Sequence, residues 1–437
     1  MEEIQHWKKF FDFEKKNHLF DYKDENGVYI WDIIRYEVYI AYMWELDVKK
    51  REAVSIKEYL GKATYSLISL IKLFFKKKND NLFYIYSRDL SGEYFYDRNI
   101  SHIIPFVKKE PIIIEFNYFF RIKYFHQNFL FRPFSFFKVV ASPFINKKKD
   151  FGGLINLINK ELQINWTNEV VESFVRDFKL EIKFYTWLLK QKKIKKIFVI
   201  GRHKGMFHAA KQLNIPIIEF QHGIVDAGHL FYNYPELKDF NNKIYIPDLF
   251  VTFSPFWIKG INYPVKKVIP IGNDNLYVND LLEESEPTNN ILFISSIIFG
   301  KEIIPLVERY AKENEGIKIY LKLHPDQFFE VSGYQKIFKK YANIKVISKE
   351  YNTYQLIQKS RAVVAINSTV VYEALQAGKI VFLYKKMTYY RHEHIFNHPN
   401  LYLIDNANQI NFENIYPIKN TYIFFDRFNP NLLKEIL

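Results

Sequence analysis

Short apolar runs alternate with longer amphipathic segments along most of the chain. The runs are rich in Ile, Val, Phe and Leu, and between them lie segments with apolar side chains every three or four residues, such as 168–193. Strands that alternate with helices in this way form parallel sheets with right-handed crossovers. The pattern therefore predicts an α/β protein. The predicted strands are 82–86, 112–116, 197–200, 217–220, 248–253, 267–271, 291–294, 318–323, 344–347, 362–366 and 379–383.

The same pattern divides the chain into four regions. Residues 1–78 have mainly helical spacing and predict a helical N-terminal region. Two Rossmann-like domains are expected at 79–280 and 281–409, with the boundary in the acidic and polar stretch Glu283–Asn290. Residues 410–437 are expected to form a tail with a short helix. A chain of 437 residues is long enough for two to three domains of about 100–200 residues each.

The segment 362–383 predicts a strand, a tight turn, a short helix and a second strand. Asn367, Ser368 and Thr369 are residue types that begin helices, and Gly378 is a residue type that ends one. In open parallel sheets, ligands bind at the carboxyl ends of strands, where helix N-termini attract phosphate. Ser368 and Thr369 lie at such a place, and Glu373 follows one turn later, where a carboxylate can bind both hydroxyls of a ribose. The alternative is an ordinary capped helix with a solvated glutamate.

Other polar residues also follow predicted strands. His324 comes directly after the strand 318–323 and is followed by Pro325, which prevents the strand from continuing. The strand 217–220 ends in Gln221-His222-Gly223. Because the carboxyl ends of parallel strands meet at one edge of a sheet, we expect these groups to face a common cleft. Further candidates at strand ends are Asp89, Arg202, His203, Ser295 and Ser296.

The order Gln-His-Gly, His-Pro and Ser-Thr-x-x-x-Glu over residues 195–390 resembles a known family. It is similar to the GT-B glycosyltransferases of bacterial surface polysaccharides, among them the His-Pro-bearing sialyl- and Kdo-transferases of capsule and lipopolysaccharide synthesis. It is also similar to the teichoic-acid polyol-phosphate transferases. The resemblance implies a GT-B fold, in which two Rossmann-like domains face a central cleft, here with an N-terminal helical extension. It also implies that the tail 410–437 crosses back to the first domain.

The resemblance assigns the donor nucleotide to the second domain and the acceptor to the first. His324 would donate a hydrogen bond to the donor phosphate, and one such contact contributes about 2–4 kcal/mol to lowering a barrier. The donor side would comprise Ser295, Ser296, His324, Pro325, Ser368, Thr369, Glu373 and Arg391, and the acceptor side Asp89, Arg202, His203 and Gln221.

A base is needed to take the proton of the acceptor hydroxyl, and imidazole is suited to neutral pH. His222 is the first candidate, because it resembles the histidine that follows a strand in the polyol-phosphate transferases. Asp226 is the second candidate and Asp89 the third. The sialyltransferases have an acidic pair before glycine where this chain has Gln221-His222-Gly223. This departure leaves the base and the donor open.

The leading hypothesis is transfer of a sugar, with a CMP-linked sugar as donor, to a growing capsule, O-antigen or lipopolysaccharide glycan. Two reactions on the same fold are alternatives: CDP-polyol phosphotransfer, and epimerisation of UDP-N-acetylglucosamine. Epimerases need several carboxylates in the cleft, and this sequence offers few at strand ends. A basic, non-catalytic protein that binds membrane or nucleic acid is the alternative from another class.

Composition limits the classes of ligand, partner and cofactor that the protein is expected to bind. The chain has 62 Lys and Arg against 48 Asp and Glu, a net charge of +14, which favours an anionic partner. It has no zinc-finger spacing, RNA-recognition signature or basic zipper, so nucleic acid is not expected. The absence of Cys excludes disulfides and thiolate metal sites. There is no Asp-x-Asp after a strand, and His392 and His394 lack a third spaced ligand, so neither a metal nor another cofactor is expected.

Three segments indicate where in the cell the protein is expected to lie. The first residues lack the order of a signal peptide, and no apolar run approaches the ~18–20 residues that span a membrane, so we expect a cytoplasmic protein. Residues 118–138 hold ten Phe or Tyr, four Lys or Arg and no acid. They predict contact with the inner membrane face or with a lipid-linked acceptor, or else a buried arm. Residues 66–78 are expected to form a core helix, in preference to a helix on a membrane surface.

Overall fold

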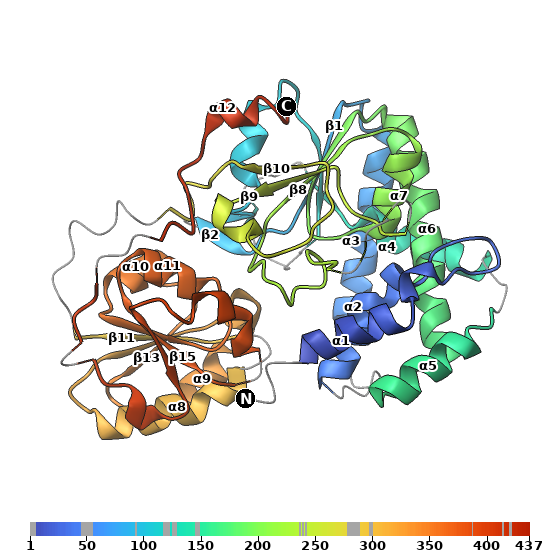
Figure 1. Ribbon diagram of the computed structural model, residues 1–437. Helices are drawn as coiled ribbons and strands as arrows, with labels where there is room; N and C mark the ends of the chain where they lie inside the picture. Colours follow the sequence, from blue (N-terminus) through green and yellow to red (C-terminus); the bar gives the residue numbers. More distant parts are fainter. Residues whose placement is uncertain are drawn as a thin grey trace.

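The computed structural model describes most of the chain in two α/β domains (Figure 1). The described residues are 6–44, 56–91, 94–116, 123–124, 129–144, 149–235, 237, 240, 243–277, 289–296, 300–386, 388–412, 415–418 and 422–437.

The first domain is built on a parallel sheet in the order β10-β9-β8-β7-β1-β4-β6. Phe83, on an interior strand of the sheet, pairs with Ile113 on one side and with Phe198 on the other. The strand predictions for this half are confirmed to within two residues at each end, whereas β6 was not predicted. The strands are β1 Asn81–Ile85, β4 Ile112–Glu115, β6 Leu130–Phe131, β7 Lys196–Ile200, β8 Ile217–Phe220, β9 Leu249–Thr252 and β10 Lys267–Pro270.

Alternate residues of β1 pack in two different apolar cores, one on each face of the sheet. Leu82 and Tyr84 pack beneath the N-terminal helices, whereas Phe83 and Ile85 pack on the opposite face with residues near the chain's C-terminus. Burial on both faces explains why the strands are continuously apolar rather than alternating. The helices of this domain are α1 His6–Lys16, α2 Trp31–Trp44, α3 Ile56–Phe75, α4 Pro133–Ala141, α5 Gly152–Leu162, α6 Asn168–Lys192 and α7 Lys204–Gln212.

A small three-stranded sheet was not predicted. It consists of β2 Asp89–Ser91, β3 Tyr94–Tyr96 and β5 Lys123–Tyr124, in the order β2-β3-β5. Strands of two or three residues have too little periodicity to be recognised in a sequence. This sheet follows β1 directly and carries Asp89 at its start.

The second domain is built on a parallel sheet in the order β13-β12-β11-β14-β15-β16. All five predicted strands are confirmed, and β16 was not predicted. The elements are β11 Ile291–Ile294, α8 Gly300–Glu313, β12 Ile319–Lys322, α9 Val331–Phe338, β13 Ile344–Ile347, α10 Thr353–Gln358, β14 Ala362–Ala365, α11 Val370–Gln376, β15 Ile380–Tyr384 and β16 Leu401–Ile404. Gly378 has φ +66°, a left-handed conformation that suits glycine after a helix.

The two domains share an apolar cluster and the C-terminal segment. Trp257 of the first domain packs on Tyr372 of α11, with ring centroids 4.7 Å apart, and its indole N–H donates to the carbonyl of Phe424 at 2.6 Å. The segment then continues onto the first domain and ends in α12 Pro430–Leu433, drawn in red at the top of Figure 1. There Leu433 packs on the sheet face that holds Phe83. The predicted boundary 283–290 lies, except for its last two residues, outside the described residues.

No helix among the described residues is both long and apolar enough to cross a membrane. The longest apolar helix, α3, ends at Phe75 and is followed by three lysines.

Candidate active site

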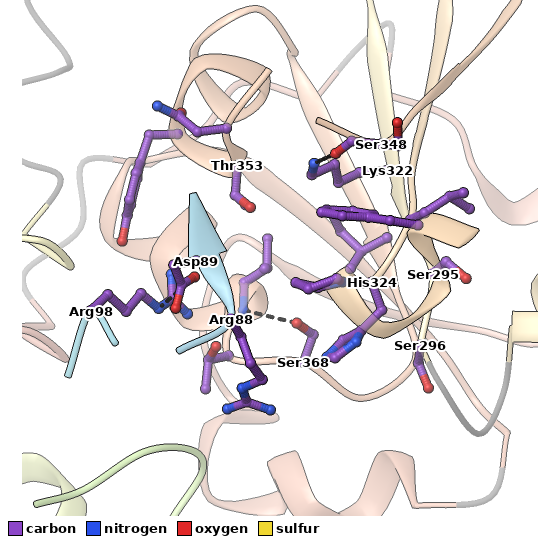
Figure 2. Close-up of a pocket in the computed structure, with 18 of the residues that line it drawn as sticks. Arg88, Asp89, Arg98, Ser295, Ser296, Lys322, His324, Ser348, Thr353 and Ser368 are labelled. Atoms are coloured by element: carbon purple, nitrogen blue, oxygen red, sulfur yellow. Dashed lines mark hydrogen bonds and ion pairs between the residues drawn. The ribbon is translucent and has the colours of Figure 1, made fainter. Parts of the chain in front are cut away.

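A cavity of about 640 Å³ lies between the two domains, at the carboxyl ends of the strands of both sheets. In Figure 2, Arg88, Asp89 and Arg98 of the first domain lie opposite Lys322, His324 and Ser295 of the second. Nine predicted site residues line this one cavity: Asp89, His222, Ser295, Ser296, His324, Pro325, Ser368, Thr369 and Arg391. Residues that are far apart in the sequence therefore meet where the parallel-sheet topology places them.

His324 is held at the end of β12 by its own backbone surroundings. Pro325 begins a 3₁₀ helix, Pro325–Glu330, and the N–H of Asp326 donates to His324 Nδ1 at 3.2 Å. The Gln327 side chain accepts in return from the N–H of His324 at 3.1 Å. Burial, with smaller contributions from Arg88, Arg98 and Lys322, lowers the pKa of His324 to about 3. The imidazole is therefore neutral at physiological pH.

The predicted serine and threonine side chains lie around the same corner of the second domain. The N–H of Ser295 pairs with the carbonyl of Lys322 at 2.9 Å, which extends the sheet by one residue. Ser368 Oγ accepts from the N–H of Val370 at 3.2 Å, directly before α11, whose N-cap residue is Thr369. Thr369 Oγ1 donates to Glu373 Oε1 at 3.3 Å. Ser368 and His324, both labelled in Figure 2, line the same cavity.

Glu373 occupies a different place from the one predicted. Its side chain is fully buried and does not line the cavity, and Oε1 receives Arg98 Nη2 from the other domain at 3.3 Å. Burial raises the pKa of Glu373 and the Arg98 guanidinium opposes this. The prediction that Glu373 binds ribose is therefore corrected: in this arrangement its carboxylate joins the two domains.

His222 lies on the first-domain wall, just after β8. Its Nδ1 is 3.2 Å from the hydroxyl of Tyr232, and burial, with Arg88 and Arg391 nearby, lowers its pKa to about 4. Gln221 is buried beneath it and does not line the cavity. The Gln221 side chain donates to the carbonyl of Gly223 at 2.8 Å and accepts from the N–H of Phe253 at 3.1 Å. It therefore shapes the loop that carries His222 and does not face an acceptor.

Asp226 was the second candidate for the base, and the structure argues against that role. Its side chain is 5% exposed, lies outside the cavity lining and accepts from Arg391 Nε and Nη2 at 3.0 and 2.8 Å. A carboxylate held by the arginine and outside the cavity lining does not face an acceptor hydroxyl. Arg391 itself lines the cavity, from a 3₁₀ helix, Tyr389–Ile395, that follows β15.

Arg202 and His203 are not on the cavity wall. Arg202 donates to the hydroxyl of Tyr234 at 2.5 Å and to the carbonyl of Phe231. The His203 ring lies 3.9 Å from that of Tyr84, and burial lowers its pKa to about 3. Both predictions of an acceptor-side role are corrected, because these side chains pack into the domain beneath the cavity.

Most of the positive charge on the cavity wall was not predicted from the sequence. Five cationic side chains line the cavity against the two carboxylates of Asp89 and Glu350, an excess that suits an anionic ligand. Lys322 was assigned only to a strand, yet its Nζ bonds the carbonyl of Ser348 at the cavity wall. Burial lowers the pKa of Lys322 to about 8, opposed by Glu350 and Asp89. The five cations are Arg88, Arg98, Lys322, Lys349 and Arg391.

The histidines considered as metal ligands are engaged with a tyrosine. The hydroxyl of Tyr372 is 3.2 Å from His392 Nδ1 and 3.1 Å from His394 Nε2, and His392 is fully buried. Within the described part of the chain, no three His, Asp or Glu side chains are grouped as metal ligands.

Part of the chain matches a known protein family. Residues 300–393 match the model of a family described as capsule polysaccharide biosynthesis protein. The matched segment contains four of the predicted site residues that line the cavity from the second domain: His324, Ser368, Thr369 and Arg391. No match was found among curated proteins.

Several solved structures share a broadly similar arrangement. MnaA of S. aureus with UDP is 15% identical, with a TM-score of 0.43, and the similarity covers 76% of this chain and 86% of that one. UDP-GlcNAc 2-epimerase from Neisseria meningitidis is 13% identical, with a TM-score of 0.43 and coverage of 75% and 88%. MurG of Acinetobacter baumannii is 9% identical, with a TM-score of 0.39 and coverage of 76% and 88%. The fold of this chain is defined by the strand order of its two parallel sheets.

Proposed function

We propose that the chain is a glycosyltransferase that moves a sugar from a nucleotide-activated donor to a bacterial surface glycan. The observation that carries the proposal is the meeting of His324, Ser368 and Thr369 with His222 across one cationic cavity. The second-domain groups suit the phosphate of a nucleotide. The histidine opposite suits the hydroxyl of an acceptor.

The reaction follows from these positions. The acceptor hydroxyl attacks the anomeric carbon of the donor, the bond from that carbon to the phosphate oxygen breaks, and the nucleotide leaves with the bonding electrons. His222 takes the hydroxyl proton, and a hydrogen bond from His324 stabilises the negative charge on the leaving phosphate. Lys322 and Arg391 add positive charge around the same anion. These residues need no metal ion for the steps assigned to them.

The proposed polymer is a capsule or related surface polysaccharide, and the proposed donor is a CMP-linked sugar. The family match over residues 300–393 supports the polymer class. CDP-polyol phosphotransfer would use the same cationic wall. Epimerisation finds less support, because only Asp89 and Glu350 bring carboxylates to the described cavity wall.

The test uses the full chain in two steps. Thermal shifts with CMP, CDP and UDP first show whether the cavity binds nucleotide, and a matched set with Arg88→Met and Lys322→Met shows whether the binding is in this cavity. Activated donors are then supplied with oligosaccharide acceptors, and the products are identified by mass. Sugar transfer with release of nucleotide is expected. Polyol-phosphate transfer or epimerised donor would replace the proposal, and no response to any nucleotide would favour a non-catalytic binding protein.

We also propose that the protein docks on an anionic membrane surface, through α3 rather than through the predicted stretch 118–138. Residues 118–122 and 125–128 lie outside the described residues. In residues 129–138 of that stretch, Phe131 is buried, and Phe134 and Phe137 pack on the core beneath the N-terminal helices. This is what the alternative of a buried arm predicted.

Helix α3 packs one face on the core, where Leu73 is fully buried, and leaves the other face open to solvent. Its serines face inward: Ser66 Oγ accepts from the N–H of Phe136 at 3.0 Å, and Ser69 Oγ accepts from the N–H of Phe131 at 2.8 Å. Five large apolar residues of α3 face solvent, with Phe74 61% and Phe75 84% exposed. An apolar face bordered by lysines is typical of a helix that lies in the head-group region of an anionic membrane. The exposed apolar residues are Tyr65, Ile68, Ile71, Phe74 and Phe75, and the lysines are Lys72, Lys76, Lys77 and Lys78.

A further inference from the structure

Two histidines face the cavity from opposite domains, and each has one ring nitrogen engaged by a fixed partner. From these partners we infer that His324 presents an N–H at Nε2, whereas His222 presents a lone pair at Nε2, fixed by a chain of hydrogen bonds through Tyr232 to Glu219. Tyr232 and Glu219 are then positioning residues for the base. This inference rests on the proposed function for its kinetic consequence, but the proton positions can be measured without any reaction.

The state of His324 follows from its backbone partner. The N–H of Asp326 is an obligatory donor, and it points at His324 Nδ1 at 3.2 Å. A nitrogen that accepts a hydrogen bond carries no proton, so the proton of the neutral ring is on Nε2. The Asp326 carboxylate lies farther from Nδ1, at 3.6 Å. His324 is thereby a hydrogen-bond donor without a charge.

The state of His222 follows from the single proton of Tyr232. The Tyr232 hydroxyl donates to Glu219 Oε1 at 3.0 Å, and its oxygen is 3.2 Å from His222 Nδ1. Since the hydroxyl proton is committed to the carboxylate, the oxygen can only accept from an N–H at Nδ1. A neutral ring with its proton on Nδ1 has a lone pair on Nε2. His222 is thereby a proton acceptor.

Glu219 is placed to hold this arrangement. It is fully buried on β8, and its second oxygen accepts from the hydroxyl of Tyr263 at 2.7 Å. Two hydroxyl donors on two carboxylate oxygens are the pattern of an ionised group, because an ionised carboxylate can only accept. Burial raises the pKa of Glu219, and nearby Arg202 together with the two tyrosines opposes this.

The assignment gives each histidine one task in the proposed transfer. The acceptor proton passes to His222 Nε2, which makes the ring an imidazolium whose Nδ1–H stays on Tyr232. The negative charge that leaves with the phosphate meets Nε2–H of His324. The charged or titratable groups that face His222 are Arg88, Arg391, His203, His229 and Tyr232. None of the described carboxylates is its direct partner, so the relay through Tyr232 is the route by which Glu219 acts.

The direct test is ¹⁵N NMR of the full chain labelled at histidine, without nucleotide or acceptor. Signals are assigned from the peaks that vanish in His222→Gln and His324→Gln. We expect a protonated Nδ1 and a lone-pair Nε2 at His222, and the reverse at His324. The same tautomer at both rings, or the two reversed, would overturn the inference. In Tyr232→Phe the His222 signals should move toward a tautomer mixture, and unchanged signals would remove Tyr232 from the assignment.

Kinetics supply the second readout, with Tyr263→Phe as the matched control. Both variants remove one buried hydroxyl from Glu219, but only Tyr232→Phe breaks the link to His222. We expect Tyr232→Phe to lower kcat at least tenfold more than the control, with the KM for donor unchanged in both. Equal losses would contradict the relay. If NMR finds the expected tautomers but the protein transfers no sugar, the proposed function is overturned and the assignment of the proton positions still holds.

Discussion

Asp226 of the first domain and Arg391 of the second form an ion pair across the domain interface, with Nη2 and Nε of the arginine 2.8 and 3.0 Å from the same carboxylate oxygen. Glu373 and Arg98 form a second pair in the reverse sense, at 3.3 Å, with the carboxylate on the second domain. Both arginines also line the cavity. The walls of the site and the contacts that hold the domains together are thus made partly by the same side chains.

The first prediction concerns the stability of this interface. Arg391→Met leaves the nearly buried Asp226 carboxylate without its partner, and we expect a loss of about 1–3 kcal/mol in the free energy of unfolding. The double variant Arg391→Met/Asp226→Asn removes the unpaired charge and should be more stable than Arg391→Met alone. Urea unfolding of the single and double variants measures this. Strictly additive losses would contradict a direct pair.

The second prediction is a pH dependence of nucleotide affinity. Burial lowers the pKa of Lys322 to about 8, so the free protein loses this charge as the pH rises through that value. An anionic ligand binds the charged form better, and affinity for a nucleotide should fall several-fold between about pH 7.5 and pH 9. Calorimetric titration over this range measures it. Lys322→Met should bind more weakly at pH 7.5 and lose the dependence; a wild-type affinity that stays level would contradict the assignment.

A third prediction concerns acid stability. The His102 ring lies 5.0 Å from Phe428 of the C-terminal segment, and neither of its nitrogens has a hydrogen-bond partner. Burial lowers the pKa of His102 to about 4, opposed by Asp274. A depressed pKa gives stability that is fully present above the unfolded value of about 6.5 and is lost as the pH falls toward 4.

As the pH falls from about 6.5 to about 4, the free energy of unfolding of His102→Leu should therefore rise relative to that of the wild type. The expected rise is about 1.4 kcal/mol per pH unit. The measurement is the free energy of unfolding in urea at a series of pH values. Comparing the two proteins removes the contributions of other groups, including Glu181, whose raised pKa of about 7 acts in the opposite direction. Parallel curves for the two proteins would contradict the predicted shift.

The fourth prediction tests the membrane surface on α3. Replacing Ile71 and Phe75 by serine removes exposed apolar area without changing charge. We expect binding to phosphatidylglycerol vesicles to weaken at least tenfold, since burying a phenylalanine side chain contributes about 1.5–3 kcal/mol. Phe329→Ser in the second domain, where the side chain is 67% exposed, is the matched control. Equal sedimentation of both variants, or equal binding to neutral phosphatidylcholine, would contradict docking through this helix.

Local pattern predicted the elements that position the site. The strand Ile217–Phe220 was predicted with its observed bounds, because an apolar run between a proline turn and Gln-His-Gly has distinct ends. Pro325 likewise marked where β12 stops and His324 begins a 3₁₀ helix. Parallel topology then implied that these strand ends would meet. His222, His324 and Ser368 accordingly line one cavity.

Long-range pairing could not be predicted in the same way. Glu373 lies one turn after Thr369, which locally indicated an open carboxylate, but its charge partner Arg98 is 275 residues away in the chain. The prediction that 66–78 form a core helix is confirmed for one face of α3 only. Helical spacing does not show how much of a helix is buried, and here the inward face combines Leu73 with Ser66 and Ser69. The two serines bond backbone groups of a neighbouring strand and helix, which no local pattern contains.

The central claim is that His222 and His324 act on one reacting centre from two domains. The most direct measurement is turnover of donor, in the presence of acceptor, by His222→Gln and His324→Gln, with His208→Gln on α7, outside the cavity lining, as control. The account predicts a loss of about a hundredfold or more in each cavity variant and little change in the control. Near-wild-type turnover by either cavity variant would contradict it.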